Sequence, residues 1–331
     1  MSHLTSGKKK HLEKLINSKG IISAAAMDQR GSLKKSIAKE KGVDPSEVTS
    51  KMMEEFKTAV TKILTPHASA ILLDPEFGIP AAQQRSQNAG LILAYETTGY
   101  EQNTPGRVPR LIPHYTVSQL VADGANAVKI LLYYSPFEDA KINAVKHAWV
   151  ERIGVECAYH DIPYFLEFVG YPTLEGEEEN SLAFAQKKPE IVRKSMEEFS
   201  KEKYHVDVLK VEIPVNMKFV EGSRSFKGQK AYSKEEAKAL YQATAKATDK
   251  PFIYLSAGVS DDEFRDSLEL AAESGVSYNG VLCGRATWKE GIPVYAKSGI
   301  AALEQWLSDR GVQNIQALNT VLDKGAKALK L

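Results

Sequence analysis

The chain has 331 residues, of which 43% are hydrophobic and 26% are charged, the composition of an ordinary globular protein. Its formal net charge is +1, which argues against nucleic acid or an anionic membrane surface as a partner. No apolar run is long enough to cross a bilayer, and no apolar core follows the basic N-terminal run, so a secretory signal is not expected. The only cysteines, Cys157 and Cys283, are far apart in apolar surroundings, so we expect reduced thiols and a cytoplasmic protein.

Eight short apolar segments have the length and composition of buried β-strands, and helical segments separate them. The expected strands cover residues 21–27, 68–73, 90–94, 127–134, 163–170, 206–213, 252–256 and 279–283. The expected helices cover residues 11–18, 32–41, 44–64, 116–123, 137–159, 189–203 and 300–309, and two more begin at Ser233 and Ser260. Loops are expected over residues 97–113, 176–179 and 221–230.

Strands that are apolar on both faces and alternate with helices are typical of a parallel sheet covered on both sides. Eight such units in one chain favour a closed barrel over an open sheet. No linker or low-complexity segment divides the chain. We therefore predict an α/β fold in which residues 1–331 form a single-domain (β/α)8 TIM barrel, with a short N-terminal helical extension and a C-terminal helical tail.

The sixth expected strand, V-D-V-L-K-V-E-I, carries a lysine inside an apolar run. In a strand with a period of two, Val206, Val208 and Lys210 point to the same side. A lysine held among valines loses hydration, which favours its uncharged form, the form that attacks a carbonyl carbon. The alternative, which is the more common one for a single lysine, is a strand-end residue that extends its amine to solvent.

Polar residues recur at the carboxyl ends of the expected strands, where the active sites of α/β barrels lie. They are Asp28, Gln29, Lys129, Glu167, Lys210, Ser256 and Arg285. Each has a purely structural alternative: Asp28 can cap the next helix, the lysines and Glu167 can form ion pairs, and Ser256 can belong to a turn. The convergence of the whole set on one rim favours a functional site, because burying these charges together is costly.

The loops after the seventh and eighth expected strands read S-A-G-V and C-G-R-A-T-W. In α/β barrels these two loops often bind phosphate through backbone N–H groups. Gly258 and Gly284 would let the backbone approach a ligand closely, and Arg285 can bind phosphate oxygens through two parallel hydrogen bonds. A phosphate site is therefore expected at this end of the barrel.

A buried amine, a second amine, a carboxylate and a phosphate site together indicate imine chemistry on a phosphorylated carbonyl compound. Lys210 would attack a ketone, Glu167 would transfer protons, and Lys129 would hold a hydroxyl or a phosphate. A metal-dependent aldolase would need ligands for a Lewis-acid ion. The seven histidines form no closely spaced pair, so we expect no metal and no other cofactor.

Seven motifs occur in order along the chain: A-M-D-Q-R-G, L-L-D-P-E-F-G, A-V-K-I-L-L-Y-Y, F-L-E, D-V-L-K-V-E-I-P-V-N, Y-L-S-A-G-V and G-V-L-C-G-R-A-T-W. As a set, they resemble the tagatose 1,6-bisphosphate aldolase family of class I aldolases over nearly the whole chain. The resemblance implies metal-free cleavage of D-tagatose 1,6-bisphosphate to dihydroxyacetone phosphate and D-glyceraldehyde 3-phosphate, in the tagatose 6-phosphate route of lactose and galactose catabolism. It also implies that Lys210 is the Schiff-base lysine and Glu167 the acid/base group. The positions implied to contact substrate are Asp28, Gln29, Lys129, Ser256 and Arg285.

Two other functions stay open at this point. One is an aldolase of the same mechanism that acts on a sulfonated sugar phosphate, 6-deoxy-6-sulfofructose 1-phosphate. The other is a non-catalytic sugar-phosphate sensor, against which the intact Lys210, Glu167 and Lys129 argue. The sequence also leaves open the C4 stereospecificity, the residues that hold the second phosphate, any regulatory role and whether the chain forms a homo-oligomer.

Overall fold

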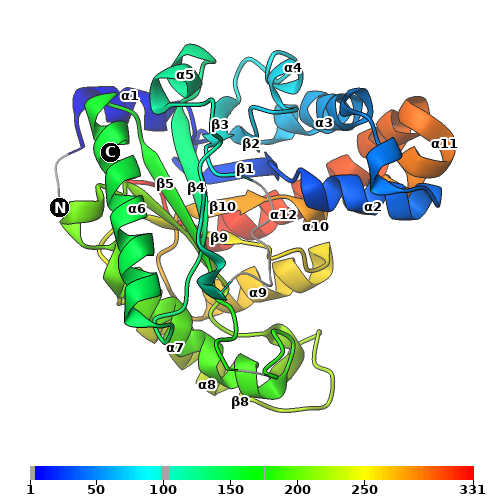
Figure 1. The fold of residues 1–331 in the computed structure, drawn as a ribbon. Coiled ribbons are helices and arrows are strands. Elements are labelled where there is room, and N and C mark those ends of the chain that lie inside the picture. Colours follow the sequence, from blue (N-terminus) through cyan, green and yellow to red (C-terminus); the bar gives the residue numbers. More distant parts are fainter. Residues whose placement is uncertain (1–3, 98–104, 175) are drawn as a thin grey trace.

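The computed structural model describes residues 4–97, 105–174 and 176–331, so part of the predicted loop 97–113 lies outside the described residues. Eight parallel strands form a closed barrel in the order β1-β10-β9-β6-β5-β4-β3-β2 (Figure 1). They are β1 (Ile22–Met27), β2 (Ala70–Leu73), β3 (Gly90–Ala94), β4 (Ala127–Tyr133), β5 (Tyr164–Val169), β6 (Val208–Glu212), β9 (Phe252–Leu255) and β10 (Gly280–Cys283). The predicted fold class, a single (β/α)8 barrel, is confirmed.

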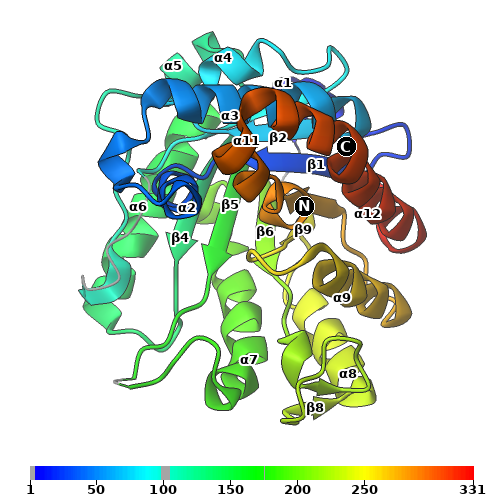
Figure 2. The same ribbon diagram turned by 90° about the vertical axis from the view of Figure 1, so that its right-hand side faces the viewer.

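The helices surround the barrel, as the two views show (Figure 1 and Figure 2). The longer ones are α1 (Ser6–Glu13), α2 (Gly31–Lys41), α3 (Ser50–Leu64), α5 (Val117–Ala122), α6 (Ala140–Tyr159), α7 (Leu182–Phe199), α8 (Lys234–Ala245), α9 (Asp261–Glu273), α11 (Gly291–Trp306) and α12 (Val312–Gly325). Two single-turn helices, α4 (Ile79–Ala82) and α10 (Arg285–Trp288), were not predicted. In the part of the chain that the structure describes, no helix has both the length and the apolar content that a membrane span requires.

Alternate residues of each strand point into the barrel and form an apolar cluster of their own. Its strand members are Ile22, Ala24, Ala26, Ala70, Leu72, Ile92, Ala94, Ala127, Phe165, Val208, Ile253 and Leu282, and Leu12, Leu15 and Leu329 join them from outside the strands. The intervening strand residues face the helices and belong to the larger outer core. This period-two division is what a barrel with a packed interior requires.

The amino end of the barrel is closed by residues from both ends of the chain. Leu12, Leu15 and Leu329 pack against the lowest interior layer, and the Leu329 N–H donates to the Gly20 carbonyl over 2.8 Å. Apolar side chains therefore fill this end of the interior. Both cysteines are free and buried, as the sequence predicted.

Several predicted boundaries are wrong for identifiable reasons. The first helix begins five residues earlier than expected, because Thr5 caps it by accepting a hydrogen bond from the Lys8 N–H. Helix α7 begins at Leu182, capped by Ser181, so Pro189 lies inside the helix and not in its first turn. The expected helix over residues 44–64 is a short 3-10 turn, Pro45–Glu47, followed by α3.

The last expected helix, residues 300–309, is also divided differently. Helix α11 begins at Gly291 and is interrupted at Gly299, whose φ of 79° suits glycine best. A π-helical turn, Leu307–Gly311, then leads into α12, which agrees with the predicted helical tail. The polar loop over residues 221–230 joins a two-stranded ribbon, β7 (Val220–Glu221) and β8 (Tyr232–Ser233).

Candidate active site

Lys210 lies inside the barrel and is paired with a carboxylate. Its Nζ is 2.9 Å from Oε2 of Glu167, and the residue is only 3% exposed. The strand-end alternative, in which the amine extends into solvent, is therefore wrong. The register explains the pair, because Glu167 on β5 is directly opposite Lys210 on β6, and both side chains point inward.

The predicted direction of Val206 is wrong, although that of Val208 is correct. Val208 belongs to the interior cluster directly below Lys210. Val206 precedes β6, which begins at Val208, and its side chain packs in the outer core. Alternation holds only within the strand, so the pattern could not be extended into the segment before it.

Lys129 on β4 is the centre of a buried charge network. Its Nζ lies 2.7 Å from Glu167, 2.8 Å from Asp28 and 3.1 Å from Glu96, and the residue is fully buried. Burial alone would lower the pKa of Lys129, but the charges of Asp28, Glu167 and Glu96 raise it well above its usual value. The cation is therefore permanent, and it holds Glu167 beside Lys210.

Asp28 is held ionised by the same network. Burial by itself would raise the pKa of this carboxyl, but the neighbouring charges of Lys129 and Lys210 and the hydrogen bond from Lys129 bring the pKa well below its usual range. The carboxylate lines the pocket that contains Lys210. It can accept a hydrogen bond from a sugar hydroxyl without becoming protonated at neutral pH.

Glu96 and Arg30 belong to this network and were not among the predicted site residues. The Arg30 guanidinium donates to the backbone carbonyl of Glu96 over 2.7 Å and also contacts the carboxylates of Glu96 and Glu76. Glu96 is the second residue after β3, so it also lies at the carboxyl end of a strand, as Lys129 and Glu167 were predicted to do. Its position after a strand is therefore a sequence signal that could have identified Glu96.

A second buried ion pair fixes the end of β1. The Nζ of Lys57, on α3, donates to the carbonyl oxygens of Met27 over 2.6 Å and Gln29 over 2.8 Å, and it is paired with Asp74. Lys57 and Asp74 are fully buried. No sequence pattern indicated Lys57, because a lysine within an amphipathic helix is normally exposed. The pair positions the backbone from which Asp28 and Gln29 project.

The loops after β9 and β10 approach each other closely. Ala257 and Gly258 both have positive φ, 48° and 80°, and a Cβ at Gly258 would lie 2.6 Å from Cζ of Arg285. A Cβ at Gly284 would lie 2.9 Å from the Ala26 carbonyl oxygen. Gly258 is favoured by its positive φ and leaves room for the exposed guanidinium of Arg285, whereas Gly284 is favoured by its close approach to the backbone of β1.

Gln29 presents an acceptor that lacks a partner. Its Oε1 atom is buried, and within the described residues no hydrogen-bond donor reaches it. Gln29 lines the same pocket as Lys210. Because an unpaired buried polar atom is costly, this oxygen is suited to accept a hydrogen bond from a ligand hydroxyl.

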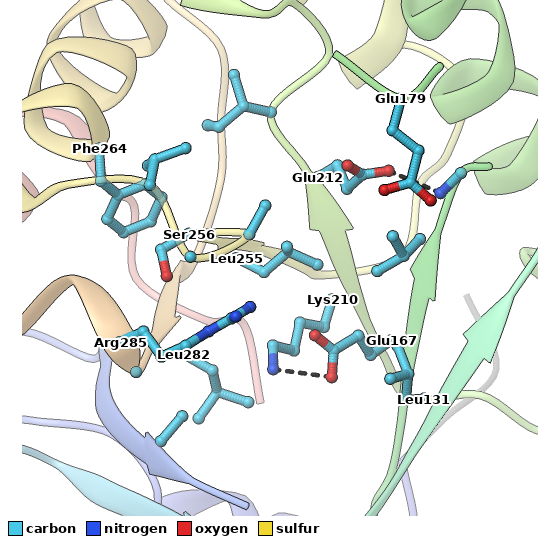
Figure 3. Close-up of a pocket in the computed structure, with 18 of the residues that line it drawn as sticks. Leu131, Glu167, Glu179, Lys210, Glu212, Leu255, Ser256, Phe264, Leu282 and Arg285 are labelled. Carbon is cyan, nitrogen blue, oxygen red and sulfur yellow. Dashed lines mark hydrogen bonds and ion pairs between the residues drawn. The ribbon is translucent and has the colours of Figure 1, made fainter. Parts of the chain in front are cut away.

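The pocket has a volume of about 520 Å³ and opens at the carboxyl ends of the strands. Lys210 and Glu167 point toward each other within it (Figure 3). Eight of the nine predicted site residues line this pocket: Asp28, Gln29, Glu167, Lys210, Ser256, Gly258, Gly284 and Arg285. The ninth, Lys129, lies beneath it and reaches the pocket through Asp28 and Glu167.

Comparison with protein families identifies one match over most of the chain. A profile described as DeoC/LacD family aldolase matches residues 22–290. Among the described residues, no group of three or more histidine, cysteine or acidic side chains is arranged to hold a metal ion.

Curated relatives resemble the chain over almost its full length. Tagatose 1,6-diphosphate aldolase 2 of Enterococcus faecalis is 51% identical over 322 residues, which cover 97% of this chain and 95% of that protein. Tagatose 1,6-diphosphate aldolase of Listeria innocua is 47% identical, with 98% and 94% of the two chains covered. Tagatose 1,6-diphosphate aldolase 2 of Streptococcus pyogenes is 48% identical, with 98% and 97% covered.

Two solved structures share the fold at low sequence identity. A fructose-bisphosphate aldolase from Plasmodium falciparum has a TM-score of 0.67 at 13% identity, covering 99% of this chain and 97% of its own. A Schiff-base-forming fructose-1,6-bisphosphate aldolase has a TM-score of 0.56, also at 13% identity, covering 94% and 98%. At this identity the likeness shows the barrel architecture alone.

Proposed function

The chain belongs to the DeoC/LacD family of aldolases, and we propose that it is a Schiff-base-forming enzyme for tagatose 1,6-bisphosphate. It would cleave this substrate reversibly to dihydroxyacetone phosphate and D-glyceraldehyde 3-phosphate. The observation that carries the proposal is the contact between the buried amine of Lys210 and the carboxylate of Glu167 inside the pocket. The names of the relatives from Enterococcus, Listeria and Streptococcus support the choice of sugar.

The bond changes follow from that contact. The uncharged Nζ of Lys210 attacks C2 of the open-chain ketose, and Glu167 supplies the proton with which the carbinolamine oxygen leaves as water. The resulting iminium ion withdraws electrons from C3. Loss of the C4 hydroxyl proton to a carboxylate breaks the C3–C4 bond and releases the aldehyde, while the bonding electrons form an enamine. Protonation of C3 and hydrolysis of the imine then release dihydroxyacetone phosphate and restore Lys210.

The surrounding charges favour this sequence. The Nζ of Lys129 forms an ion pair with Glu167 at 2.7 Å, so the carboxylate that exchanges protons stays in reach of Lys210. Asp28 and Gln29 offer acceptors for substrate hydroxyls from the end of β1. We assign the C1 phosphate to the Arg285 side of the pocket, with Ser256, Gly258 and Gly284 forming the loops around it.

The same proposal places the enzyme in the tagatose 6-phosphate route of lactose and galactose catabolism. Phosphorylated sugars do not cross membranes unaided, so we place it in the cytoplasm. A sulfonated sugar phosphate would carry one negative charge where tagatose 1,6-bisphosphate carries about two, so parallel assays separate these substrates. The names of the relatives favour the bisphosphate.

The direct test is to trap the imine. The enzyme is incubated with dihydroxyacetone phosphate, reduced with borohydride and digested, and the modified peptide is identified by mass spectrometry. We expect the adduct on Lys210, no adduct on the neighbouring Lys129, and cleavage activity that EDTA does not change. An adduct on any other lysine, or activity lost with EDTA, would refute the mechanism.

A further inference from the structure

The proposed substrate carries a phosphate at each end, and the β9 and β10 loops can hold only one of them. In the barrel order, β4 is four strands from β10 in both directions, so these two strands are diametrically opposite. Figure 3 shows Ser256 and Arg285 on one side of the pocket and Glu179 and Glu212 on the other, with the Lys210–Glu167 pair between them. A linear bisphosphate bound through its C2 carbon at Lys210 would extend its far end toward Glu179 and Glu212.

A guanidinium lies behind the lining on this side. Arg107 is held over the rings of Tyr133, at 4.7 Å, and Tyr171, at 4.9 Å, and it donates to Oε1 of Glu179 over 3.0 Å. Tyr133, the last residue of β4, and Glu179 both line the pocket. The planes of the two rings meet at 82°, so the rings confine the guanidinium from two directions and limit the freedom that it would lose on binding an oxyanion.

Glu179 occupies the position that an anion from the substrate could take. Its side chain is 48% exposed, whereas that of Arg107 is only 12% exposed. The carboxylate can therefore rotate into solvent at little cost, because an exposed ion pair contributes little to stability. Arg107 cannot follow it, since both rings hold it in place. The guanidinium, which lies behind Tyr133 and Glu179 of the pocket lining, would then have lost its carboxylate partner.

A lysine on the same side completes the candidate subsite. Lys188, on α7, lines the pocket and is 3.0 Å from Oε1 of Glu212. The other oxygen of Glu212 accepts the Gly170 N–H over 2.7 Å, so this carboxylate is fixed by the backbone. With Glu179 in solvent, the two cations and the one remaining carboxylate carry a net charge of +1.

Other basic residues near this side are already committed, and Lys146, for example, donates to the Tyr171 hydroxyl over 2.8 Å. The Arg30 guanidinium is 3% exposed and is engaged by Glu76, Glu96 and the Glu96 backbone carbonyl. Lys218 also lines the pocket, but it follows β6, which is only two strands from β10. Arg107 and Lys188 are therefore the cations best placed for a group at the far end of the substrate.

We propose that Arg107 and Lys188 bind the C6 phosphate of the hexulose bisphosphate, and that this phosphate displaces the carboxylate of Glu179 from Arg107. The inference rests on the proposed function, which supplies a substrate with two phosphates. In this proposal the Glu179 carboxylate pairs with Arg107 while the pocket is empty, and it competes with the C6 phosphate for the same guanidinium. The same subsite would bind the phosphate of glyceraldehyde 3-phosphate in the condensation direction.

The test compares tagatose 1,6-bisphosphate with tagatose 1-phosphate, which lacks only the C6 phosphate. The measured quantity is the ratio of kcat/KM for the first substrate to that for the second. We expect Arg107→Met to lower this ratio roughly 10- to 100-fold, the effect of losing charged hydrogen bonds to one anion. Lys188→Met should lower it less. Glu179→Gln should raise it, through a lower KM for the bisphosphate, because the competing charge is gone.

Arg193→Met is the matched control, since Arg193 pairs with Glu197 four residues along α7 and does not line the pocket. The ratio for this control should stay within about twofold of wild type. If Arg107→Met and Glu179→Gln change both substrates equally, or if Lys218→Met alone shows the selective loss, the assignment is wrong. Should Arg107→Met fail to fold, Glu179→Gln alone decides: a ratio that does not rise refutes the proposal. Failure of the proposed function looks different, because the wild type would then cleave neither substrate.

Discussion

The two ends of the barrel are built from the same strands by the same alternation, yet they have opposite character. At the amino end the inward positions are apolar, and Leu12, Leu15 and Leu329 pack against them. Two residues further along the same strands, the inward positions carry charges: Val208 is followed by Lys210, and Phe165 by Glu167. The inward-facing side chains therefore change from apolar to charged between one inward position of a strand and the next.

The contrast separates the residues that stabilise the barrel from those that serve its chemistry. The apolar end gains free energy by excluding water, about 25 cal/mol for each Å² of apolar surface that it buries. The charged end has to recover the cost of desolvating several ions, which succeeds only when every charge has partners. Lys129 meets this condition with three carboxylates, whereas Lys210 has one. Removing either amine should therefore have different consequences.

The largest effects are expected from replacing these two lysines in turn. Lys210→Met removes the nucleophile and should lower kcat at least about 10⁴-fold. The stability of this variant should change little, because Glu167 keeps Lys129 as its partner. Lys129→Met should reduce activity as well, and it should also lower the free energy of unfolding by about 3–5 kcal/mol, since buried carboxylates lose their shared cation.

Steady-state cleavage assays combined with urea denaturation distinguish the two outcomes. Equal losses of stability in both variants would show that the charges at the carboxyl end act as one undivided network. A Lys129→Met protein as stable as wild type would show that the three carboxylates find other partners. Either result would contradict the different roles of Lys129, which stabilises the buried carboxylates, and Lys210, which reacts with the substrate.

The fold could be predicted from sequence because its signals are local and repeated. Each strand is an apolar run bounded by polar residues, and eight such runs in alternation with helices leave few architectures. Boundaries were less certain where caps decided them. The side chains of Thr5 and Ser181 cap α1 and α7 by accepting single hydrogen bonds from the N–H groups of Lys8 and Phe184, and a hydrophobic pattern does not show which residue is the cap.

The site residues were predictable where a strand end marked them and not elsewhere. Lys210, Glu167 and Asp28 follow from the rule that barrel chemistry lies at the carboxyl ends of strands. Lys57 and Arg107 do not, because one lies on an outer helix and the other in a long loop before α5. Their importance comes from contacts with residues distant in sequence, Asp74 for the first and Glu179 for the second.

A mutation at the apolar end should have the opposite effect to Lys210→Met: it should lower stability and leave activity unchanged. Leu15 is fully buried, and Leu15→Ala should lower the free energy of unfolding by about 2–5 kcal/mol through the lost burial and the cavity left behind. Because the site is at the other end of the barrel, kcat/KM should stay within about twofold of wild type. Urea denaturation and steady-state kinetics on one preparation measure both quantities. A large fall in kcat/KM without a change in stability would contradict the separation of the two ends.

The smallest predicted effect concerns Lys146, a buried amine behind the carboxyl end that donates to the Tyr171 hydroxyl over 2.8 Å. Burial lowers its pKa from 10.5 to about 8, against the opposing charge of Glu138 and with the help of Arg107. Between these two values the unfolded chain holds more protons on Lys146 than the folded protein does. The free energy of unfolding should therefore rise as pH increases across this window, by about 2 kcal/mol after solvent screening.

Lys146→Met should remove this rise, so its stability difference from wild type should change between about pH 7.5 and pH 10. Urea unfolding at closely spaced pH values measures that difference. Lys141→Met, on the exposed side of the same helix, is the control and should leave the wild-type slope unchanged. Parallel pH curves for wild type and Lys146→Met would mean that the amine behind Tyr171 keeps its ordinary proton affinity. The desolvation that distinguishes the carboxyl end would then not extend beyond the residues lining the pocket.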